Sequence, residues 1–201
     1  MTMDKIKTNL EKKGYKVTVF DTAAAAKDYL LGEIKGTTVG IGGSMTVEEM
    51  GLYEELKKDN LVYWHWKAVN GESVTALRDK AATTEVYISS VNGIAETGEI
   101  INIDGTGNRV AATIYGHKKV YLIVGQNKIA PDYEQAVWRA RNIASPLNAK
   151  RLGIATPCAV NGDRCYDCES PARICRAFGV LACAPGGSEY EVVLVKENLG
   201  Y

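Results

Sequence analysis

Short apolar runs alternate with amphipathic stretches along most of this chain. The runs with the length and composition of strands are residues 15–20, 37–41, 61–66, 85–89 and 119–124. Stretches with the spacing of helices lie around them, at residues 4–13, 23–32, 46–58, 73–82 and 131–144. Several strand runs are apolar throughout, so the alternation predicts an α/β fold with a mainly parallel sheet and helices on both faces. The run Lys119–Val124 is the clearest strand, and we expect it inside the sheet with both faces covered.

Two segments interrupt this alternation. Residues 91–108 are rich in Gly, Asn, Asp and Thr, and they predict a hairpin before the next helix. Residues 156–188 hold all five cysteines and three of the five prolines. The 201 residues are the length of about one domain. We therefore expect a single α/β domain over residues 1–201, with a cysteine-rich segment at 156–188.

Composition and charge narrow the classes of function. The 24 Lys and Arg balance the 24 Asp and Glu, which leaves a formal net charge of zero. A nucleic-acid partner is therefore not expected, since such proteins carry a basic face or tail, and neither is a membrane surface. The chain begins with a polar amphipathic stretch that lacks the apolar core of a signal peptide, so we expect a cytoplasmic protein.

A glycine-rich turn follows the predicted strand 37–41 and precedes a predicted helix. It consists of Gly42, Gly43, Ser44, Met45 and Thr46. A turn of this kind at the carboxyl end of a parallel strand favours an anion, because backbone N–H groups and the helix dipole point toward it. The alternative is a structural corner without a ligand. The turn has neither the lysine of a P-loop nor the spacing of a dinucleotide fingerprint.

The polar hairpin supplies candidate chemical groups. Glu96, Glu99 and Asp104 are candidate proton-transfer residues, and a desolvated carboxyl among them would have the raised pKa that such a role needs. Asn108 and Arg109 are candidate ligand-binding residues beside them. The alternative is a hairpin whose two polar turns simply hold solvated carboxylates.

Four cysteines form the strongest motif of the chain. Cys158, Cys165, Cys168 and Cys175 cluster in a chain that has no cysteine before residue 158. In a cytoplasmic protein such a cluster favours metal or redox chemistry over disulfides. We expect the four thiolates to bind one metal centre, a [4Fe–4S] cluster in preference to zinc. The alternative is a set of reduced, packed thiols, and Cys183 is predicted to be a buried cysteine outside the ligand set.

Some conspicuous aromatic and histidine residues favour structural roles. Trp64 and Trp66 would share one face of the predicted strand, with His65 on the other in a core or edge position. His117 lies in a polar turn and is expected in solvent. Trp138 is expected to pack in the core.

Taken together, these segments resemble the LUD (lactate-utilisation) domain family, formerly a domain of unknown function. The matching stretches are residues 42–46, 92–109, 120–128, 148–151, the cysteine segment and 193–201. The resemblance implies a Rossmann-like fold of the NagB/RpiA/CoA-transferase-like type. In that group the Gly-Ser/Thr turn binds sugar phosphate or coenzyme A, and the analogous carboxylate would fall among Glu96, Glu99 and Asp104. The named role of the family is oxidation of lactate to pyruvate in a three-protein complex, which implies partner subunits.

Three classes of function remain open. The first is an enzyme that acts on a small hydroxy or keto acid such as lactate, or on a phosphorylated sugar or coenzyme A compound. The second is an iron–sulfur electron-transfer or accessory subunit. The third is a ligand sensor on the same fold. We expect a small anionic ligand as a partner, and the sequence is compatible with a homo-oligomer.

Overall fold

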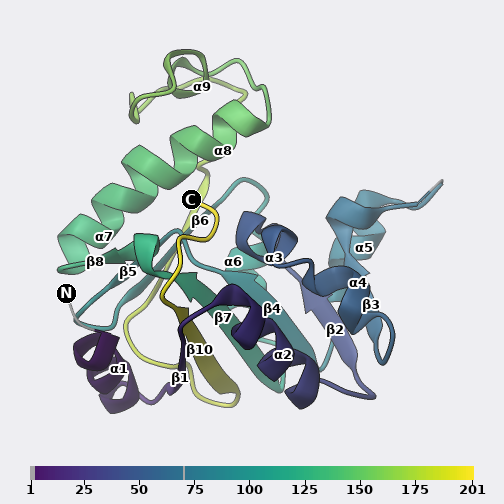
Figure 1. Ribbon diagram of the computed structural model, residues 1–201. Helices are drawn as coiled ribbons and strands as arrows, with labels where there is room; N and C mark the ends of the chain where they lie inside the picture. Colours follow the sequence, from purple (N-terminus) through teal and green to yellow (C-terminus); the bar gives the residue numbers. More distant parts are fainter. Residues whose placement is uncertain (1–2, 70) are drawn as a thin grey trace.

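A six-stranded parallel sheet forms the centre of the computed structural model, which describes residues 3–69 and 71–201 (Figure 1). Every strand pair in this sheet is parallel. Its strands, in spatial order, are β1 (Lys16–Phe20), β10 (Glu189–Val195), β7 (Lys119–Gly125), β4 (Val86–Ser90), β2 (Thr38–Ile41) and β3 (Leu61–Trp64). The predicted Rossmann-like α/β fold with a mainly parallel sheet is thus confirmed.

Strand β7 occupies the position that its sequence predicts. It pairs with β10 on one side and β4 on the other, and residues 120–124 are buried. Val120, Leu122 and Val124 pack on one face of the sheet, whereas Tyr121 and Ile123 pack on the other. An apolar run without alternation fits this position because both faces are covered.

Different elements cover the two faces. Helix α1 (Met3–Lys12) buries Ile6 and Leu10 against one face, together with part of a second sheet. The other face is covered by α2 (Ala23–Glu33), α3 (Met45–Glu49) and α4 (Leu52–Leu56). Helix α5 (Val74–Ala81) packs beside β3 and β2. The amphipathic spacing of α1 thus serves to close the core.

The second sheet contains the predicted hairpin. Strands β5 (Gly93–Ala95) and β6 (Ile100–Asp104) are antiparallel, and β8 (Ile129–Ala130) and β9 (Ala177–Leu181) flank them. The hairpin leads into the short helix α6 (Asn108–Ala112). A third apolar cluster joins this sheet to α7 (Tyr133–Arg139).

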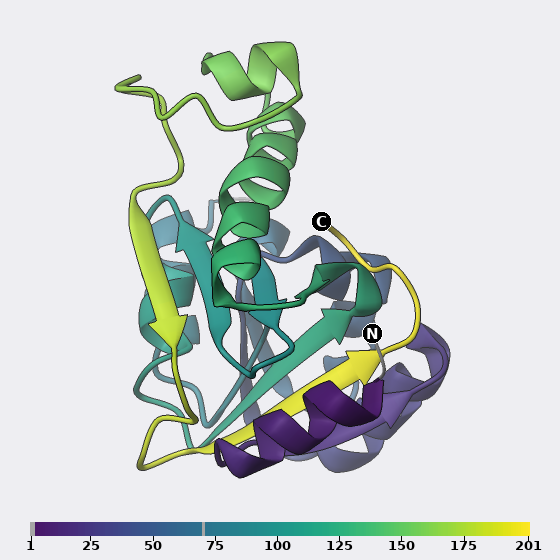
Figure 2. The same ribbon diagram turned by 90° about the vertical axis from the view of Figure 1, so that its left-hand side faces the viewer.

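Helix α7 begins a long helical rod. It continues through a π-helical turn, Ala140–Ala144, into α8 (Ser145–Arg151). The short helix α9 (Pro157–Asn161) and the loop that follows it lie at the far end of this rod, away from the central sheet, before the chain returns through β9 (Figure 2). The sequence predicted a helix only over residues 131–144. The rod continues beyond it, and Pro146 lies in the first turn of α8, directly after the π-helical turn.

Four local predictions were wrong. The helix expected over 46–58 is divided at Gly51, whose φ of 60° is left-handed. The strand expected over 61–66 ends at Trp64 and gives way to a 3₁₀ turn at His65–Lys67. The rings of Trp64 and Trp66 stack with centroids 5.3 Å apart. His117 is buried against Tyr87, and Trp138 is 53% exposed on α7. Tertiary packing determines the structure and the burial at these positions, and local polarity alone did not predict it.

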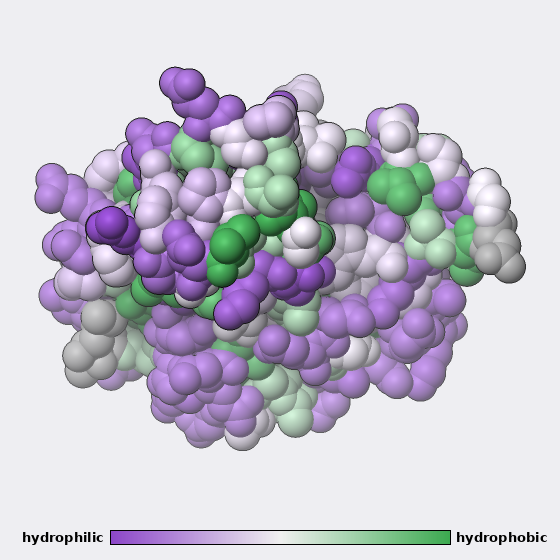
Figure 3. Space-filling model, turned by 90° about the horizontal axis from the view of Figure 1, so that it is seen from above, coloured by the Kyte–Doolittle hydropathy of each residue, from purple (hydrophilic) through white to green (hydrophobic). Residues whose placement is uncertain are grey.

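The surface carries mixed side chains. Seen from above, hydrophobic side chains form small groups separated by hydrophilic ones (Figure 3). Within the described residues, no helix has both the length and the apolar character needed to cross a membrane.

Candidate functional site

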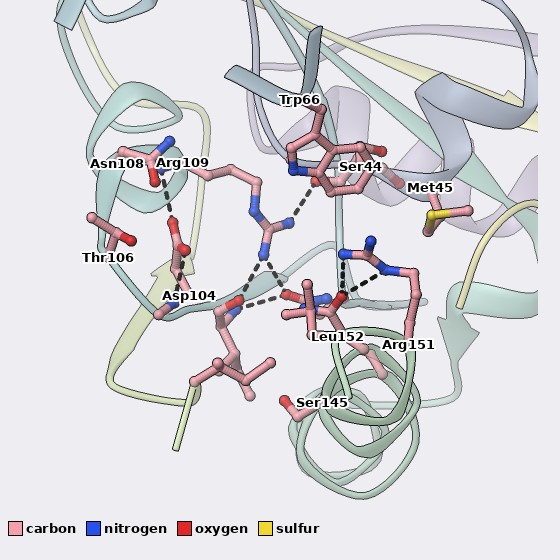
Figure 4. Close-up of a pocket in the computed structure, with 18 of the residues that line it drawn as sticks. Ser44, Met45, Trp66, Asp104, Thr106, Asn108, Arg109, Ser145, Arg151 and Leu152 are labelled. Atoms are coloured by element: carbon pink, nitrogen blue, oxygen red, sulfur yellow. Dashed lines mark hydrogen bonds between the residues drawn. The ribbon is translucent and has the colours of Figure 1, made fainter. Parts of the chain in front are cut away.

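A pocket lies where the central strands end. After β2 the chain enters α3 on one face of the sheet, whereas after β4 it enters β5 and β6 on the other. Such a divergence opens a crevice at the carboxyl ends of parallel strands, where ligands bind in this type of sheet. The pocket has a volume of about 420 Å³ (Figure 4). Its wall comes from residues 43–45, 65–66, 74, 78, 90–92, 103–106, 108–109, 128, 144–145, 148, 151–152, 174 and 201.

The glycine turn forms one side of this pocket, and its two glycines permit close packing. A Cβ at Gly42 would lie 2.9 Å from both Ser89 Oγ and the Tyr87 hydroxyl oxygen. A Cβ at Gly43 would lie 3.2 Å from the Trp66 ring. Both glycines therefore have a structural reason to be there, whether or not the turn binds an anion.

The polar residues of the turn have defined positions. Ser44 caps α3, where its Oγ accepts a hydrogen bond from Val47 N. Ser44 and Met45 line the pocket, and Thr46 is fully buried behind them. The first N–H groups of a helix have no acceptor within it. The start of α3 therefore presents backbone N–H donors to the pocket.

Arg109 links the hairpin to the central sheet. Its Nη1 donates to Asn102 Oδ1 at 2.9 Å and to Ser90 O at 3.4 Å. Its Nη2 donates to Asn92 Oδ1 at 2.8 Å and to Ile103 O at 2.6 Å. The guanidinium is buried, and these bonds place it as a support for the pocket wall with its charge close to the cavity.

The three candidate carboxylates are not brought together. Asp104 lines the pocket, and it also caps α6, since its Oδ2 accepts from Arg109 N at 2.8 Å. Glu96 instead pairs with Lys5, and Glu99 pairs with Lys13. Both lysines lie at α1, so these two carboxylates lie outside the pocket wall. Of the predicted ligand-binding residues, Asn108 lines the pocket with Arg109.

Lys128 is a second buried basic residue of the pocket, beside Arg109. It ends a 3₁₀ turn, Gln126–Lys128, directly after β7, and only 3% of it is exposed. Its Nζ donates to Thr46 Oγ1 at 2.8 Å and to Ser90 Oγ at 2.9 Å. Burial, together with the positive charges of Arg139 and Arg109, lowers the pKa of Lys128 to about 7. The amine is therefore partly neutral at physiological pH.

Other side chains add charge and shape. Arg151 lies over the Trp66 ring at 4.6 Å, and its Nε donates to the Tyr201 hydroxyl at 2.7 Å. Arg78 lies across the pocket beside His65, and burial is the main reason that the pKa of His65 falls to about 4. The imidazole is therefore neutral at pH 7, and the cations set the charge of the pocket.

Positive charge dominates this pocket. Arg78, Arg109, Lys128 and Arg151 line it, against the single carboxylate of Asp104 among the described lining residues. Within the described part of the chain, none of these four cations forms an ion pair with a carboxylate. An anionic ligand would supply the missing counter-charge.

The sequence analysis missed three residues of the pocket wall, namely Lys128, Arg78 and Arg151. A usable signal existed for Lys128, because it comes directly after the clearest parallel strand, where ligands bind in open sheets. Arg78 and Arg151 lie on helices, and a basic residue on a helix is usually a solvated one. Their convergence depends on how α5 and α8 pack, which periodicity does not reveal.

Cys158, Cys165 and Cys168 lie outside the pocket wall, whereas Cys175 follows the lining residue Ile174 and packs against the apolar cluster of the second sheet. Cys158, Cys165, Cys168 and Cys175 are half-buried free thiols. Cys183, which we predicted to be buried, is exposed, because its neighbour Ala184 packs against the core instead.

Three of the four sulfur atoms have separate partners. Cys158 Sγ lies 3.3 Å from Thr156 Oγ1, Cys165 Sγ accepts from Asp167 N at 3.4 Å, and Cys175 Sγ accepts from Arg173 Nη2 at 3.4 Å. Across residues 3–69 and 71–201, no three His, Cys, Asp or Glu side chains are arranged to hold a metal ion. As placed, the four cysteines therefore do not form a ligand set for an ion or a cluster.

Comparisons with known proteins agree with this fold. A crystal structure of a DUF162 family protein from Deinococcus radiodurans aligns with a TM-score of 0.56 at 12% identity, covering 96% of this chain and 95% of that one. The structure of eIF2B beta from Chaetomium thermophilum covers 65% of this chain and 43% of that one at 14% identity, with a TM-score of 0.33 that is too low to indicate a shared fold. The search of curated proteins found no match.

The family assignment comes from the sequence. The model of the LUD domain matches residues 3–195, which is nearly the whole chain. DUF162 is the former name of this domain, so the structural neighbour agrees with the match. The chain belongs to the LUD domain family.

Proposed function

We propose that this protein binds a small hydroxy or keto acid, such as lactate, in the cationic pocket and acts on it or assists its oxidation. The observation that carries the proposal is the convergence of Arg78, Lys128 and Arg151 on one cavity without carboxylate partners among the described residues. Cations that are held together in a partly dry pocket bind anions more strongly than cations in bulk water do.

The pocket also fits a small organic acid as its ligand. Arginine forms bidentate hydrogen bonds with a carboxylate or a phosphate, and Arg78 Nε is buried without a partner in the described structure. A volume of about 420 Å³ exceeds the needs of a three-carbon acid. The space suits a longer acid or a second reactant, and phosphorylated sugars and coenzyme A compounds remain the competing ligands.

Isothermal titration calorimetry tests this proposal. L-lactate, pyruvate, inorganic phosphate, ribose 5-phosphate and acetyl-coenzyme A are titrated separately into the full chain. We expect saturable binding of the organic acids that weakens at high salt, since the attraction is electrostatic. The Arg78→Gln variant should bind at least about tenfold more weakly, which corresponds to about 1.4 kcal/mol.

Arg164→Gln is the matched control, because Arg164 is exposed and lies outside the pocket wall. It should bind like the unaltered protein. Equal affinity of the Arg78→Gln and Arg164→Gln variants, or no binding of any organic acid, would overturn the proposal. Preference for the phosphorylated compounds would favour the sugar-phosphate or coenzyme A alternative, and binding without turnover would favour a sensor.

We also propose a second role, in which Cys158, Cys165, Cys168 and Cys175 bind an iron–sulfur cluster, or zinc, for electron transfer to partner subunits of a lactate-oxidising complex. The supporting observation is the turn between Cys165 and Cys168. Asp167 has a left-handed φ of 47° there, and its N–H points at the Cys165 sulfur. Backbone N–H groups arranged in this way are common at iron–sulfur sites.

Metal binding would have to draw the four sulfur atoms together, and such binding is commonly coupled to folding of the ligand segment. Iron, sulfide and zinc per chain are measured in protein prepared without oxygen. We expect one cluster or one zinc ion per chain, lost in Cys165→Ser and Cys168→Ser but kept in the matched Cys183→Ser. Negligible metal in the unaltered protein, or equal metal in all variants, would contradict this role.

A further inference from the structure

The amine of Lys128 has an unusual hydrogen-bond environment. Thr46 Oγ1 donates its own hydrogen to Leu199 O at 3.2 Å, and Ser90 Oγ donates its own to Ile123 O at 2.6 Å. A hydroxyl has one hydrogen, so both hydroxyls accept from Lys128 and do not donate to it. These bonds use two N–H groups of Nζ. The neutral amine has only two, and its lone pair then occupies the remaining tetrahedral position.

The surroundings of this amine favour a reaction with a bound acid. Lys128 lines the pocket, and its neighbours keep it desolvated. A Cβ at Gly200 would lie 2.8 Å from Thr46 Oγ1 and 3.4 Å from Lys128 Nζ, so the backbone near the end of the described chain closes over the amine. A desolvated lysine beside other cations is the usual form of a lysine nucleophile.

We propose that Lys128 forms an imine with the carbonyl carbon of a 2-oxo acid bound in the pocket. This inference rests on the proposed function and narrows its substrate class to acids with a carbonyl next to the carboxylate. Arg78 and Arg151 are the available partners for that carboxylate, which leaves the carbonyl for the lysine. Lys128 is then a catalytic residue that touches the reacting atom.

The step balances without an oxidant or a reductant. The lone pair of Nζ forms the C–N bond while the carbonyl π electrons move to oxygen. Both protons of Nζ pass to that oxygen, which leaves as water when the C=N bond forms. Thr46 and Ser90 accept from these two N–H groups and so orient the amine. Their own hydrogens are donated to Leu199 O and Ile123 O, so the protons reach the leaving oxygen through solvent in the pocket.

The charged groups around Lys128 fit this role. Arg109 on α6 and Arg139 on α7 disfavour the ammonium form, and Glu49 on α3 favours it. The pKa of the amine is lowered to about 7, so a large share of it is nucleophilic at physiological pH. We therefore expect the imine to form faster as the pH rises through this value.

Trapping by reduction tests the inference. The full chain is incubated with pyruvate and then with sodium cyanoborohydride, which reduces an imine to a stable secondary amine. Intact mass spectrometry should find one added reduced pyruvate, and peptide mapping should locate it on Lys128 with at least about tenfold higher occupancy than on any exposed lysine. L-lactate has no carbonyl, so it should give no adduct and should slow trapping by pyruvate.

Two variants complete the test. Lys128→Arg keeps the positive charge but should give no adduct, whereas the matched Lys118→Arg, which alters an exposed lysine, should label normally. If Lys128→Arg does not fold, the peptide map of the unaltered protein still decides. Labelling absent from Lys128, or equal on exposed lysines, overturns the imine. If calorimetry still shows binding of acids that depends on Arg78, the proposed function survives that result. If the acids neither bind nor label Lys128, both the proposed function and the imine are overturned.

Discussion

The pocket and the cysteine-rich segment hold the candidate chemical groups of this protein, and they are built in opposite ways. At the pocket, Ser90, Arg109 and Lys128 are buried, and each is fixed by hydrogen bonds. In the segment 157–180 every residue is half-buried or exposed, and three of the four sulfur atoms contact separate partners. The pocket is therefore formed before a ligand arrives, whereas the segment would take its final shape from what binds it.

This difference predicts that substitutions become less costly from the pocket to the segment. A buried polar network is stable only when every member has a partner, so loss of one member leaves several unpaired groups. An exposed ion pair can be exchanged for water at little cost. Four measurements of unfolding free energy sharpen or break this comparison.

The largest effect is expected for Arg109→Met. The change removes the four hydrogen bonds of the guanidinium. Asn92 Oδ1 still accepts from Ile103 N, and Ser90 O still accepts from Ser89 Oγ, whereas Asn102 Oδ1 and Ile103 O lose this donor. An unpaired buried acceptor costs about 1–3 kcal/mol, so we expect a loss of at least about 2 kcal/mol. Urea unfolding followed by circular dichroism measures it.

Arg109→Lys is the control for this measurement. It keeps the charge but lacks the planar fork, so it should recover only part of the loss. A loss below about 1 kcal/mol in Arg109→Met would mean that the buried network does not support the pocket wall.

The second effect is a dependence on pH that Lys128 introduces. Its pKa is about 7 in the folded protein and near 10.4 in the unfolded chain, so between these values the unfolded state binds more protons. Stability therefore rises with pH across this window, by up to about 1.4 kcal/mol per pH unit. Below about pH 7 the amine is protonated in both states, so the folded state bears the full cost of the buried charge.

Lys128→Met should abolish this slope. The difference in unfolding free energy between the unaltered protein and the variant is measured from about pH 6 to about pH 9. Lys118→Met, at an exposed lysine, should leave the slope in place. A difference that stays constant with pH would show that Lys128 is not held with a lowered pKa.

Arg109 and Lys128 also show what the sequence could and could not predict. The sheet, the inner position of β7 and the hairpin were predictable, because apolar runs and clusters of turn residues act locally. Asp104 and the glycine turn were recognised as candidates. Glu96 and Glu99 were grouped with Asp104 only because they are near in sequence; the hairpin sends them toward Lys5 and Lys13 on the opposite side.

The remaining site residues depend on tertiary packing. Arg78 and Arg151 come from helices that meet only in the folded chain, and Trp66 reaches the pocket because β3 ends at Trp64. The cysteine motif had the clearest spacing in the sequence, yet its sulfur atoms lie apart. A motif identifies ligand types, whereas burial and packing decide whether the ligands are assembled.

A third, smaller effect is expected for Asp104→Ala. Its Oδ1 accepts from Gly105 N and its Oδ2 from Arg109 N and Val110 N, so the change removes the cap of α6. Loss of such a cap costs about 1–2 kcal/mol. Because the change also removes a negative charge from the pocket, calorimetry should show tighter binding of an organic acid.

Glu99→Ala is the comparison for Asp104→Ala. Glu99 pairs with Lys13 in a half-buried ion pair outside the pocket wall, so its loss should destabilise the protein but should not change the affinity for acid. Equal effects of the two substitutions on binding would contradict the separation of these carboxylates.

The smallest effect is expected for Arg141→Met in the rod beneath the cysteine segment. Arg141 Nη2 contacts Asp167 Oδ1 at 2.8 Å, and the two side chains are 37% and 77% exposed. An exposed pair contributes about 0–1 kcal/mol, so global unfolding should hardly change. Hydrogen exchange of residues 163–168 should nevertheless quicken, because the pair ties that loop to the π-helical turn Ala140–Ala144 and local opening needs little free energy. Asp167→Asn should have the same local effect, and a global loss comparable to that of Arg109→Met would mean that the segment is as firmly built as the pocket.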